Sequence, residues 1–202
     1  MGEAATPRLV LASGSPRRAA LLARLGWAPE LRPADIDESV QPGEPPHALV
    51  VRLARTKAAT VAAGRDDEVV LGADTEVALD GRVLGKPRDD ADAATMLRSL
   101  AGRTHEVVTG LAVMRGGTAA TDLLTTRVTF RTLTAAEVAW YVGTGEPAGK
   151  AGGYALQGAG AALVDRVDGS DTNVIGLPLA AAIALVRTVG LDLLGPAQPA
   201  SR

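Results

Sequence analysis

The chain has 202 residues, enough for one large domain or for a two-lobed one. Aromatic side chains make up 2% of it and the formal net charge is −2, so it lacks the stacking surfaces and the positive excess of a nucleic-acid-binding module. It has no cysteine and two histidines, which excludes disulfides, thiolate metal sites, a cysteine nucleophile and a multi-histidine metal site. A small anionic ligand stays compatible with this composition, because a few local Arg and Lys side chains are enough to bind it.

The sequence carries no sign of a membrane partner or of secretion. No stretch approaches the roughly 20 uninterrupted apolar residues of a membrane span. Residues 1–8 lack a basic region followed by an apolar core. We therefore expect a cytoplasmic protein whose partner is neither a membrane nor a nucleic acid.

Strands and helices are predicted to alternate in the first half of the chain. Ser15 and Pro16 are typical of the first positions of a helix, and Asp80-Gly81 is typical of a hairpin turn. An apolar stripe marks the long second helix. We expect strands at 8–12 and 69–73, a hairpin at 76–84, a polar extended segment at 31–40, and helices at 16–25, 45–63 and 89–101.

The second half contains the clearest capping signal, Thr134 followed by Glu137, which predicts a helix reaching about residue 142. Because hairpins interrupt the alternation, we expect an α/β fold with a mixed sheet. We expect a single domain over residues 1–195 and a frayed Pro/Ala-rich tail over 196–202. The other expected elements are paired strands at 106–114 and 121–132, a glycine-rich loop at 143–160, a strand at 161–167 and a helix at 178–189.

The first candidate for chemistry is the segment Ser13-Gly14-Ser15-Pro16-Arg17-Arg18. A strand enters a loop of small residues that opens a helix, whose free amides and dipole favour an anion. Two hydroxyls and two guanidiniums suit phosphate oxygens. The Walker pattern is absent from the chain. The alternative is an ordinary capped helix with a solvated arginine pair.

The second candidate is Asp74-Thr75-Glu76, directly after the apolar run 69–73. An Asp that ends a buried strand is a common metal ligand or base, although it can also cap the next turn. Further carboxylates come from Asp35, Asp37 and Glu38, with the two aspartates on one face of an extended segment and Glu38 on the other. Such a run is also typical of a solvated face.

Two lysines stand out by their position. Lys57 lies on the apolar stripe of its predicted helix, four residues after Leu53, so it either extends outward or reaches a buried anion. Lys86 lies in Gly85-Lys86-Pro87, where the neighbours restrict the backbone. Together with the arginine pair and the carboxylates, these lysines favour a phosphate-plus-metal site.

The glycine-rich loop offers close backbone approach to a ligand, and Gln157 within it offers a donor and an acceptor for a base edge. Tyr154 is the ring expected nearest to such a base. The alternative is a flexible connector. The segment 171–178 indicates only a turn and an N-terminal cap.

Five stretches, taken in order, resemble the Maf family of nucleoside triphosphate pyrophosphatases. Each stretch alone is weakly specific, but the ordered set is highly specific and spans residues 9–179. One departure is Ser170-Asp171-Thr172, where the family often has an aromatic residue. The stretches are LVLASGSPRRAALL, LGADTEVALDGRVLGKP, MLRSLAGRTHEVVTG, EPAGKAGGYALQG and NVIGLPL.

The resemblance implies a long mixed β-sheet flanked by helices, in two lobes with a central cleft similar to inosine triphosphatase, usually as a homodimer. It implies hydrolysis of a nucleoside triphosphate to the monophosphate and pyrophosphate, with Asp74 as the proton acceptor that activates water. Arg17, Thr75 and Gln157 match positions that distinguish substrate classes, and they resemble the subgroup acting on dTTP and UTP; modified pyrimidine nucleotides are further candidate substrates. Polar cleft residues of the family are matched by Ser13, Arg18, Glu38, Lys57 and Lys86.

The chemistry of these residues agrees with that implication. Arg17, Arg18, Lys57 and Lys86 are available to clamp a polyanion. Mg²⁺ or Mn²⁺ is the expected cofactor, bridging phosphate oxygens and the carboxylates of Glu38 and Asp74, because only oxygen ligands are plentiful here.

Two competing interpretations remain at this stage. Asp35-Ile36-Asp37 resembles the D-x-D nucleophile motif of haloacid-dehalogenase-type phosphatases, which release orthophosphate, although residues 30–34 are not a buried apolar strand. A non-catalytic nucleotide-binding regulator of cell division (a septum formation inhibitor) is the other alternative, and it would not need Asp74.

Overall fold

A seven-stranded mixed β-sheet forms the frame of the protein, and the computed structural model describes residues 7–195. The strand order is β2-β1-β3-β5-β6-β7, and β4 pairs with β3 off this path. The first three strands are parallel to one another and the rest pair antiparallel, which confirms the predicted mixed sheet. The strands are β1 Leu9–Leu11, β2 Glu30–Leu31, β3 Val69–Leu79, β4 Arg82–Val83, β5 Thr104–Arg115, β6 Thr118–Phe130 and β7 Val164–Asp168.

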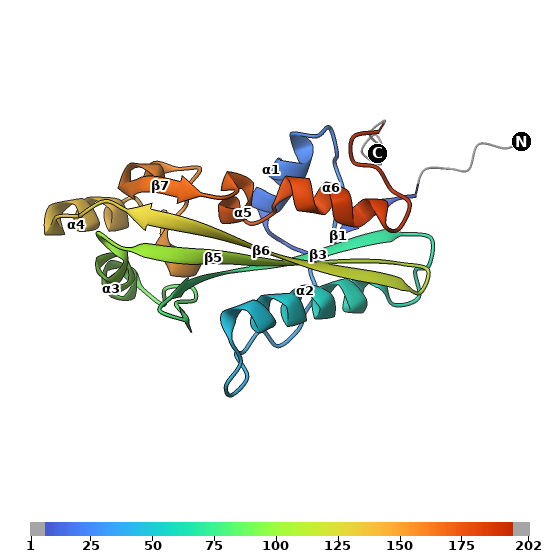
Figure 1. The fold of residues 1–202 in the computed structure, drawn as a ribbon, viewed down its shortest axis with the longest axis horizontal. Coiled ribbons are helices and arrows are strands. Elements are labelled where there is room, and N and C mark those ends of the chain that lie inside the picture. The colour runs from blue at the N-terminus through green and yellow to red at the C-terminus, as the bar shows by residue number, and fades with distance from the viewer. Residues whose placement is uncertain (1–6, 196–202) are drawn as a thin grey trace, which may run out of the picture.

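Helices cover both faces of this sheet (Figure 1). One face carries α2, and the other carries α1, α5 and α6, while α3 and α4 lie near one end of the long strands. The helices are α1 Pro16–Ala23, α2 Pro46–Ala62, α3 Asp90–Leu100, α4 Ala135–Gly143, α5 Asp171–Ile175 and α6 Leu179–Arg187, with 3-10 turns at Ala151–Gly153 and Ala159–Leu163.

The long helix α2 lies directly on the sheet at two glycines, Gly72 of β3 and Gly110 of β5. A Cβ on Gly72 would overlap the carbonyl oxygen of Ala54, and a Cβ on Gly110 would overlap that of Val50. Glycine within a strand often marks such a close backbone approach. Because α2 and the sheet are this close, the α2 side chains that face the sheet reach it, including those next to the cleft described below.

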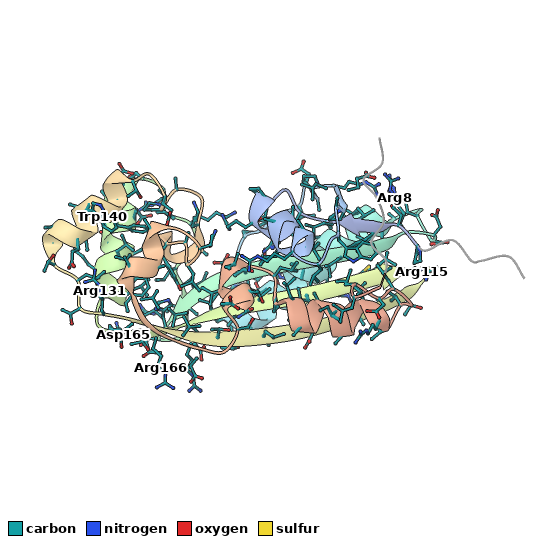
Figure 2. The ribbon with its side chains drawn as sticks, turned by 90° about the horizontal axis from the view of Figure 1, so that it is seen from above. Arg8, Arg115, Arg131, Trp140, Asp165 and Arg166 are labelled. Carbon is teal, nitrogen blue, oxygen red and sulfur yellow. The ribbon has the colours of Figure 1, made fainter. Side chains whose placement is uncertain are left out.

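Three hydrophobic clusters are found among the described residues, and the two larger ones, on the α1/α6 side and at the α3/α4 end of the sheet, define two lobes. Trp27 of the first core is anchored by its indole N–H, which donates to the carbonyl of Leu193 at 2.9 Å. The long strands β3, β5 and β6 run through both lobes. Figure 2 shows Trp140 at the far end of one lobe and Arg8 and Arg115 at the far end of the other. The first core includes Leu11, Leu22, Leu71, Leu185 and Val186, and the second Val77, Leu97, Phe130, Tyr141 and Tyr154.

Most predicted elements are confirmed within a few residues, and the capping box of Thr134 and Glu137 is present at the start of α4. The prediction that Asp74 ends a strand is wrong, because β3 continues without interruption to Leu79. The last strand begins at Val164 rather than at 161, since the preceding residues form a 3-10 turn. A short helix, α5, replaces the expected turn after residue 170.

The expected tail over 196–202 lies outside the described residues. Within residues 7–195, none of the helices has the length and apolarity needed to cross a membrane.

Candidate active site

A cleft of about 380 Å³ opens between the two lobes, where one edge of β3 is left unpaired. β1 pairs with β3 only as far as Leu71, and β4 pairs with it only from Ala78 onward. Asp74, Thr75 and Glu76 lie in the gap between these pairings. These three polar side chains can lie in the middle of a strand because no neighbouring strand covers this edge, so side chains on either face of β3 border the cleft.

Each of the nine predicted site residues lines this one cleft, although they come from six separate parts of the chain. The exposed Asp35 and Asp37 do not belong to the lining, so the structure does not place the D-x-D motif in the cleft. The predicted residues are Ser13, Arg17, Arg18, Glu38, Lys57, Asp74, Thr75, Lys86 and Gln157.

On the α2 face of β3, Asp74 forms a buried ion pair with Lys57. Lys57 Nζ lies 2.7 Å from Asp74 Oδ1 and 2.6 Å from Glu38 Oε1, so the lysine reaches a buried anion rather than extending outward. Lys86 Nζ is 3.9 Å from the other oxygen of Glu38. Partial burial opposes ionisation of Glu38, but its hydrogen bond with Lys57 and the nearby positive charges hold its pKa below the usual range.

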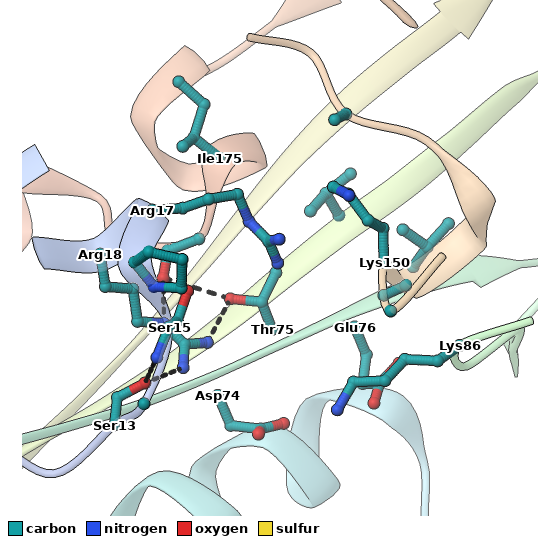
Figure 3. A pocket seen from close by; sticks show the side chains of 18 of the residues that line it. Ser13, Ser15, Arg17, Arg18, Asp74, Thr75, Glu76, Lys86, Lys150 and Ile175 are labelled. Atoms are coloured by element: carbon teal, nitrogen blue, oxygen red, sulfur yellow. Dashed lines mark hydrogen bonds between the residues drawn. The ribbon is translucent and has the colours of Figure 1, made fainter. Parts of the chain in front are cut away.

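On the opposite face, Arg18 joins three parts of the cleft. Its guanidinium donates from Nε to the carbonyl of Gly176 at 2.8 Å, from Nη1 to Ser13 Oγ at 3.0 Å and from Nη2 to Thr75 Oγ1 at 3.2 Å (Figure 3). Thr75 also shares a hydrogen bond of 2.9 Å with Thr109 Oγ1. These bonds hold Arg18 in one orientation, with the end of α5 as part of its support. The segment 171–178 therefore does more than cap a helix.

Sequence reasoning did not assign a role to Glu76, although it follows Asp74 by two residues. Alternation along a strand places both side chains on the same face of β3. Asp74 Oδ2 and Glu76 Oε2 are buried and have no hydrogen-bond partner. Burial and the charge of Asp74 raise the pKa of Glu76 to about 7, with Lys86 acting in the opposite direction. An acidic residue inside an otherwise apolar strand pattern was the signal that could have found it.

Lys150 is a second lining residue that was not singled out from the sequence. Its Nζ donates to the carbonyl of Glu146 at 2.6 Å and to that of Ala148 at 3.2 Å. These bonds hold the ammonium against the backbone of its own glycine-rich segment. Figure 3 shows Lys150 across the cleft from Arg18. The lining thus contains five cationic and three acidic side chains, a balance that favours a polyanion: Arg17, Arg18, Lys57, Lys86 and Lys150 against Glu38, Asp74 and Glu76.

The family model described as "Maf-like protein" matches residues 8–189 of the chain. The chain belongs to the Maf family. It is 56% identical over 191 residues to a protein of Anaeromyxobacter dehalogenans named dTTP/UTP pyrophosphatase, an alignment covering 93% of this chain and 96% of the relative. A protein of Moorella thermoacetica with the same name is 52% identical over 190 residues, covering 93% and 98% of the two chains. The sequence resemblance is confirmed.

Among solved structures, the Ham1 protein of Staphylococcus aureus superposes with a TM-score of 0.51 at 15% identity, covering 90% of this chain and 97% of that one. At that identity the likeness concerns the fold alone. It confirms the expected α/β architecture of this Maf-family chain.

A second cavity of about 260 Å³ adjoins the cleft of this Maf-family chain. Arg17, Gln157 and Ile175 line both spaces, so they stand at the boundary between them. Ala20 and Leu21 make the second cavity largely apolar. Tyr154 lines only the main cleft, and its hydroxyl lies 2.8 Å from His105 Nε2.

Proposed function

We propose that this chain hydrolyses dTTP and UTP, and related pyrimidine nucleotides, to the monophosphate and pyrophosphate. One observation carries the proposal: the Asp74 carboxylate, with a free buried oxygen, lies in a cleft surrounded by five cationic side chains. A triphosphate needs such positive charge, and its hydrolysis needs a group that accepts a proton from water. The names of the Anaeromyxobacter and Moorella relatives support the substrate class.

The triphosphate would be held by residues from both lobes. Arg18 and Ser13 are already oriented toward each other by a hydrogen bond, so their donors need little rearrangement to meet phosphate oxygens. Arg17, Lys86 and Lys150 complete the positive surface from the other sides of the cleft. We assign these residues to substrate binding.

Asp74 would accept the proton of the attacking water at Oδ2. Its other oxygen, Oδ1, is engaged by Lys57, which fixes the orientation of the carboxylate. The water oxygen forms a bond to one of the phosphorus atoms flanking the α–β bridging oxygen, and the bond from that phosphorus to the bridging oxygen breaks. The water proton passes to Asp74, and pyrophosphate and the monophosphate separate.

A divalent cation fits the carboxylates of this cleft, because Glu76 Oε2 is a buried carboxylate oxygen without a hydrogen-bond partner. We expected Glu38 and Asp74 as ligands, but Glu38 is engaged by Lys57 and Lys86, whereas Glu76 Oε2 is open. Over residues 7–195 no group of three or more metal-binding side chains is assembled, so substrate phosphates would supply the remaining ligands of Mg²⁺ or Mn²⁺. When bound, such a cation neutralises phosphate charge. Glu76 would hold it while Asp74 Oδ2 stays open for the proton.

Base selection would depend on Arg17, Thr75 and Gln157. Gln157 and Arg17 stand where the cleft meets the apolar cavity, which offers space for a pyrimidine ring. The exposed amide of Gln157 can donate to and accept from a base edge. Thr75 differs from Arg17 and Gln157, because its hydroxyl already accepts a hydrogen bond from Arg18.

We also propose a homodimer, which light scattering of the purified protein tests directly.

The decisive experiment offers the purified protein canonical and modified triphosphates with Mg²⁺ or Mn²⁺ and resolves the products by chromatography. We expect pyrophosphate and monophosphate, with dTTP and UTP preferred, and a loss of about 10²-fold or more in D74N. D35N is the matched control, because Asp35 lies outside the cleft. Orthophosphate as the first product, or equal activity in D74N, would contradict the proposal. Binding without turnover would favour the regulator instead.

A further inference from the structure

The glycine-rich segment, residues 143–160, carries both Lys150 and Gln157 to the cleft. The contacts that fix the backbone of this segment are separate from the residues that bind the triphosphate. Its glycines allow many conformations, so the side chain of Gln157 has a defined place only if the backbone on both sides is fixed.

A pair of side chains, Tyr141 of α4 and Glu146, fixes that backbone. The Tyr141 hydroxyl donates to Glu146 Oε1 at 2.7 Å and accepts from the backbone N–H of Ala155 at 3.0 Å. Glu146 Oε1 also accepts from the N–H of Gly160 at 2.9 Å, and Oε2 accepts from that of Ala159 at 2.9 Å. Ala155 precedes Gln157 by two residues and Ala159 follows it by two. Both flanks of Gln157 are therefore joined to this pair, Ala155 through the Tyr141 hydroxyl and Ala159 through the Glu146 carboxylate.

Packing around this carboxylate is close. A Cβ on Gly158 would overlap the Glu146 carboxylate, and a Cβ on Gly160 would lie 2.7 Å from the Tyr141 hydroxyl. Tyr141 is fully buried in the core of its lobe, so its hydroxyl has a fixed position. Partial burial opposes ionisation of Glu146, but the hydrogen bonds from Tyr141, Gly160 and Ala159 hold its pKa below the usual range. Hydrogen bonds to an ionised carboxylate are stronger than those to a neutral acceptor.

The front half of the segment is held independently. The Gly152 N–H donates to the carbonyl of Gly85 at 2.8 Å, and the Tyr154 hydroxyl lies 2.8 Å from His105 Nε2. Lys150 is held by the backbone carbonyl of Glu146, not by its carboxylate. Side-chain changes at Tyr141 and Glu146 therefore leave these contacts in place and release only the part that carries Gln157.

We propose that Tyr141 and Glu146 are positioning residues for nucleobase selection, acting by holding the backbone on both sides of Gln157. The inference rests on the proposed function, in which Gln157 contacts the base. Neither residue touches the substrate. Loss of the pair lowers discrimination between bases while binding of the triphosphate by Arg18, Lys86 and Lys150 persists.

The test compares Y141F, E146Q and E146A with Q157A, and W140F serves as the control because Trp140 is an exposed aromatic residue on the same helix. Three quantities are measured: backbone amide exchange at residues 155, 159 and 160; the ratio of kcat/KM for dTTP over dATP; and the ratio of Kd values for the non-hydrolysable α,β-methylene analogues of the same nucleotides. Thermal unfolding verifies that each variant is folded, and Y141F removes only one oxygen atom.

We expect faster amide exchange in Y141F and E146Q, and a fall of about tenfold in both ratios, comparable with that in Q157A, as the loss of one or two hydrogen bonds implies. The fall should be larger in E146A than in E146Q, which keeps one acceptor oxygen. kcat for dTTP should stay within about twofold, since the reacting groups are unchanged. W140F should match the wild type.

Two outcomes overturn the inference alone: unchanged exchange in Y141F and E146Q, or unchanged ratios in these variants when Q157A lowers them. Unchanged ratios in Q157A overturn the role of Gln157 and the inference together. Absence of turnover in the wild type contradicts the proposed function, and the Kd ratios and the amide exchange still decide whether the pair positions Gln157.

Discussion

Lys57 Nζ lies 2.7 Å from Asp74 Oδ1, and both side chains are 9% exposed on the floor of the cleft. Desolvation of two buried charges offsets much of their attraction, so such a pair adds little stability compared with apolar side chains of similar size. Removing one partner, in contrast, leaves a buried charge without compensation. The pair fixes the orientation of Asp74 and leaves Oδ2 open, which is what the proposed chemistry requires.

K57M is expected to lower the free energy of unfolding by about 3 kcal/mol and to lower pyrophosphate release sharply, because it leaves Asp74 buried without its counter-ion. Urea denaturation and a pyrophosphate assay measure the two effects. The double variant K57M/D74N should regain part of the stability. K86M is the control: Lys86 has a side chain that is 63% exposed, and its loss should weaken substrate binding with little effect on stability. A K57M protein as stable and active as the wild type would refute this role.

Q157E is expected to lower the preference for dTTP and UTP by about tenfold in kcat/KM relative to purine triphosphates. A glutamate at this position loses the amide donor and adds a negative charge, at a cost of roughly 1 kcal/mol or more. Steady-state kinetics over the nucleotide panel measures the change. Q41E adds the same charge outside the cleft and should leave the ranking as it is. An unchanged ranking in Q157E would rule out a role for Gln157 in base selection.

E76Q is expected to weaken Mn²⁺ binding at least about tenfold, since an amide oxygen is a poorer ligand for a hard cation than a carboxylate. Electron paramagnetic resonance of free Mn²⁺, recorded with a non-hydrolysable triphosphate analogue present, reports the affinity without any turnover. E106Q is the matched control, because Glu106 lies on the neighbouring strand and outside the cleft lining. Equal Mn²⁺ affinity in E76Q and the wild type would exclude Glu76 as a ligand.

The stability of the protein should depend on His105 between about pH 4 and pH 6.5. Burial lowers the pKa of His105 to about 4, below the ordinary value of about 6.5. In this range the unfolded chain binds a proton at His105 that the folded chain does not, so the free energy of unfolding falls as the pH falls, by roughly 3 kcal/mol in all.

H105Q cannot take up this proton and should lose that part of the dependence. Urea denaturation of both proteins at several pH values isolates the contribution of His105 as the difference between their slopes, because the carboxylates titrate in both. Parallel slopes would show that His105 ionises in the folded protein as freely as in the unfolded one.

Local patterns in the sequence were sufficient to predict much of the fold and most of the charged residues that line the cleft. The capping box at Thr134 predicted the start of α4, and the apolar stripe around Lys57 predicted α2 and an unusual lysine on it. Residue type and position also indicated Arg18, Asp74 and Gln157 as candidates. These signals act within a few residues along the chain, so they can be read without knowing the tertiary structure.

The tertiary structure alone decided which of these residues meet. Arg18 donates to the carbonyl of Gly176, 158 residues away, and Lys57 reaches Asp74 because α2 lies on the sheet at Gly72 and Gly110. The open edge of β3, which places Asp74 mid-strand and adds Glu76 to the cleft, depends on where β1 and β4 stop pairing. Strand register and helix docking involve segments far apart in the sequence, and no local pattern specifies them. The composition that disfavours a nucleic-acid-binding module is a property of the sequence, whereas the concentration of charged side chains in one cleft is a property of the fold.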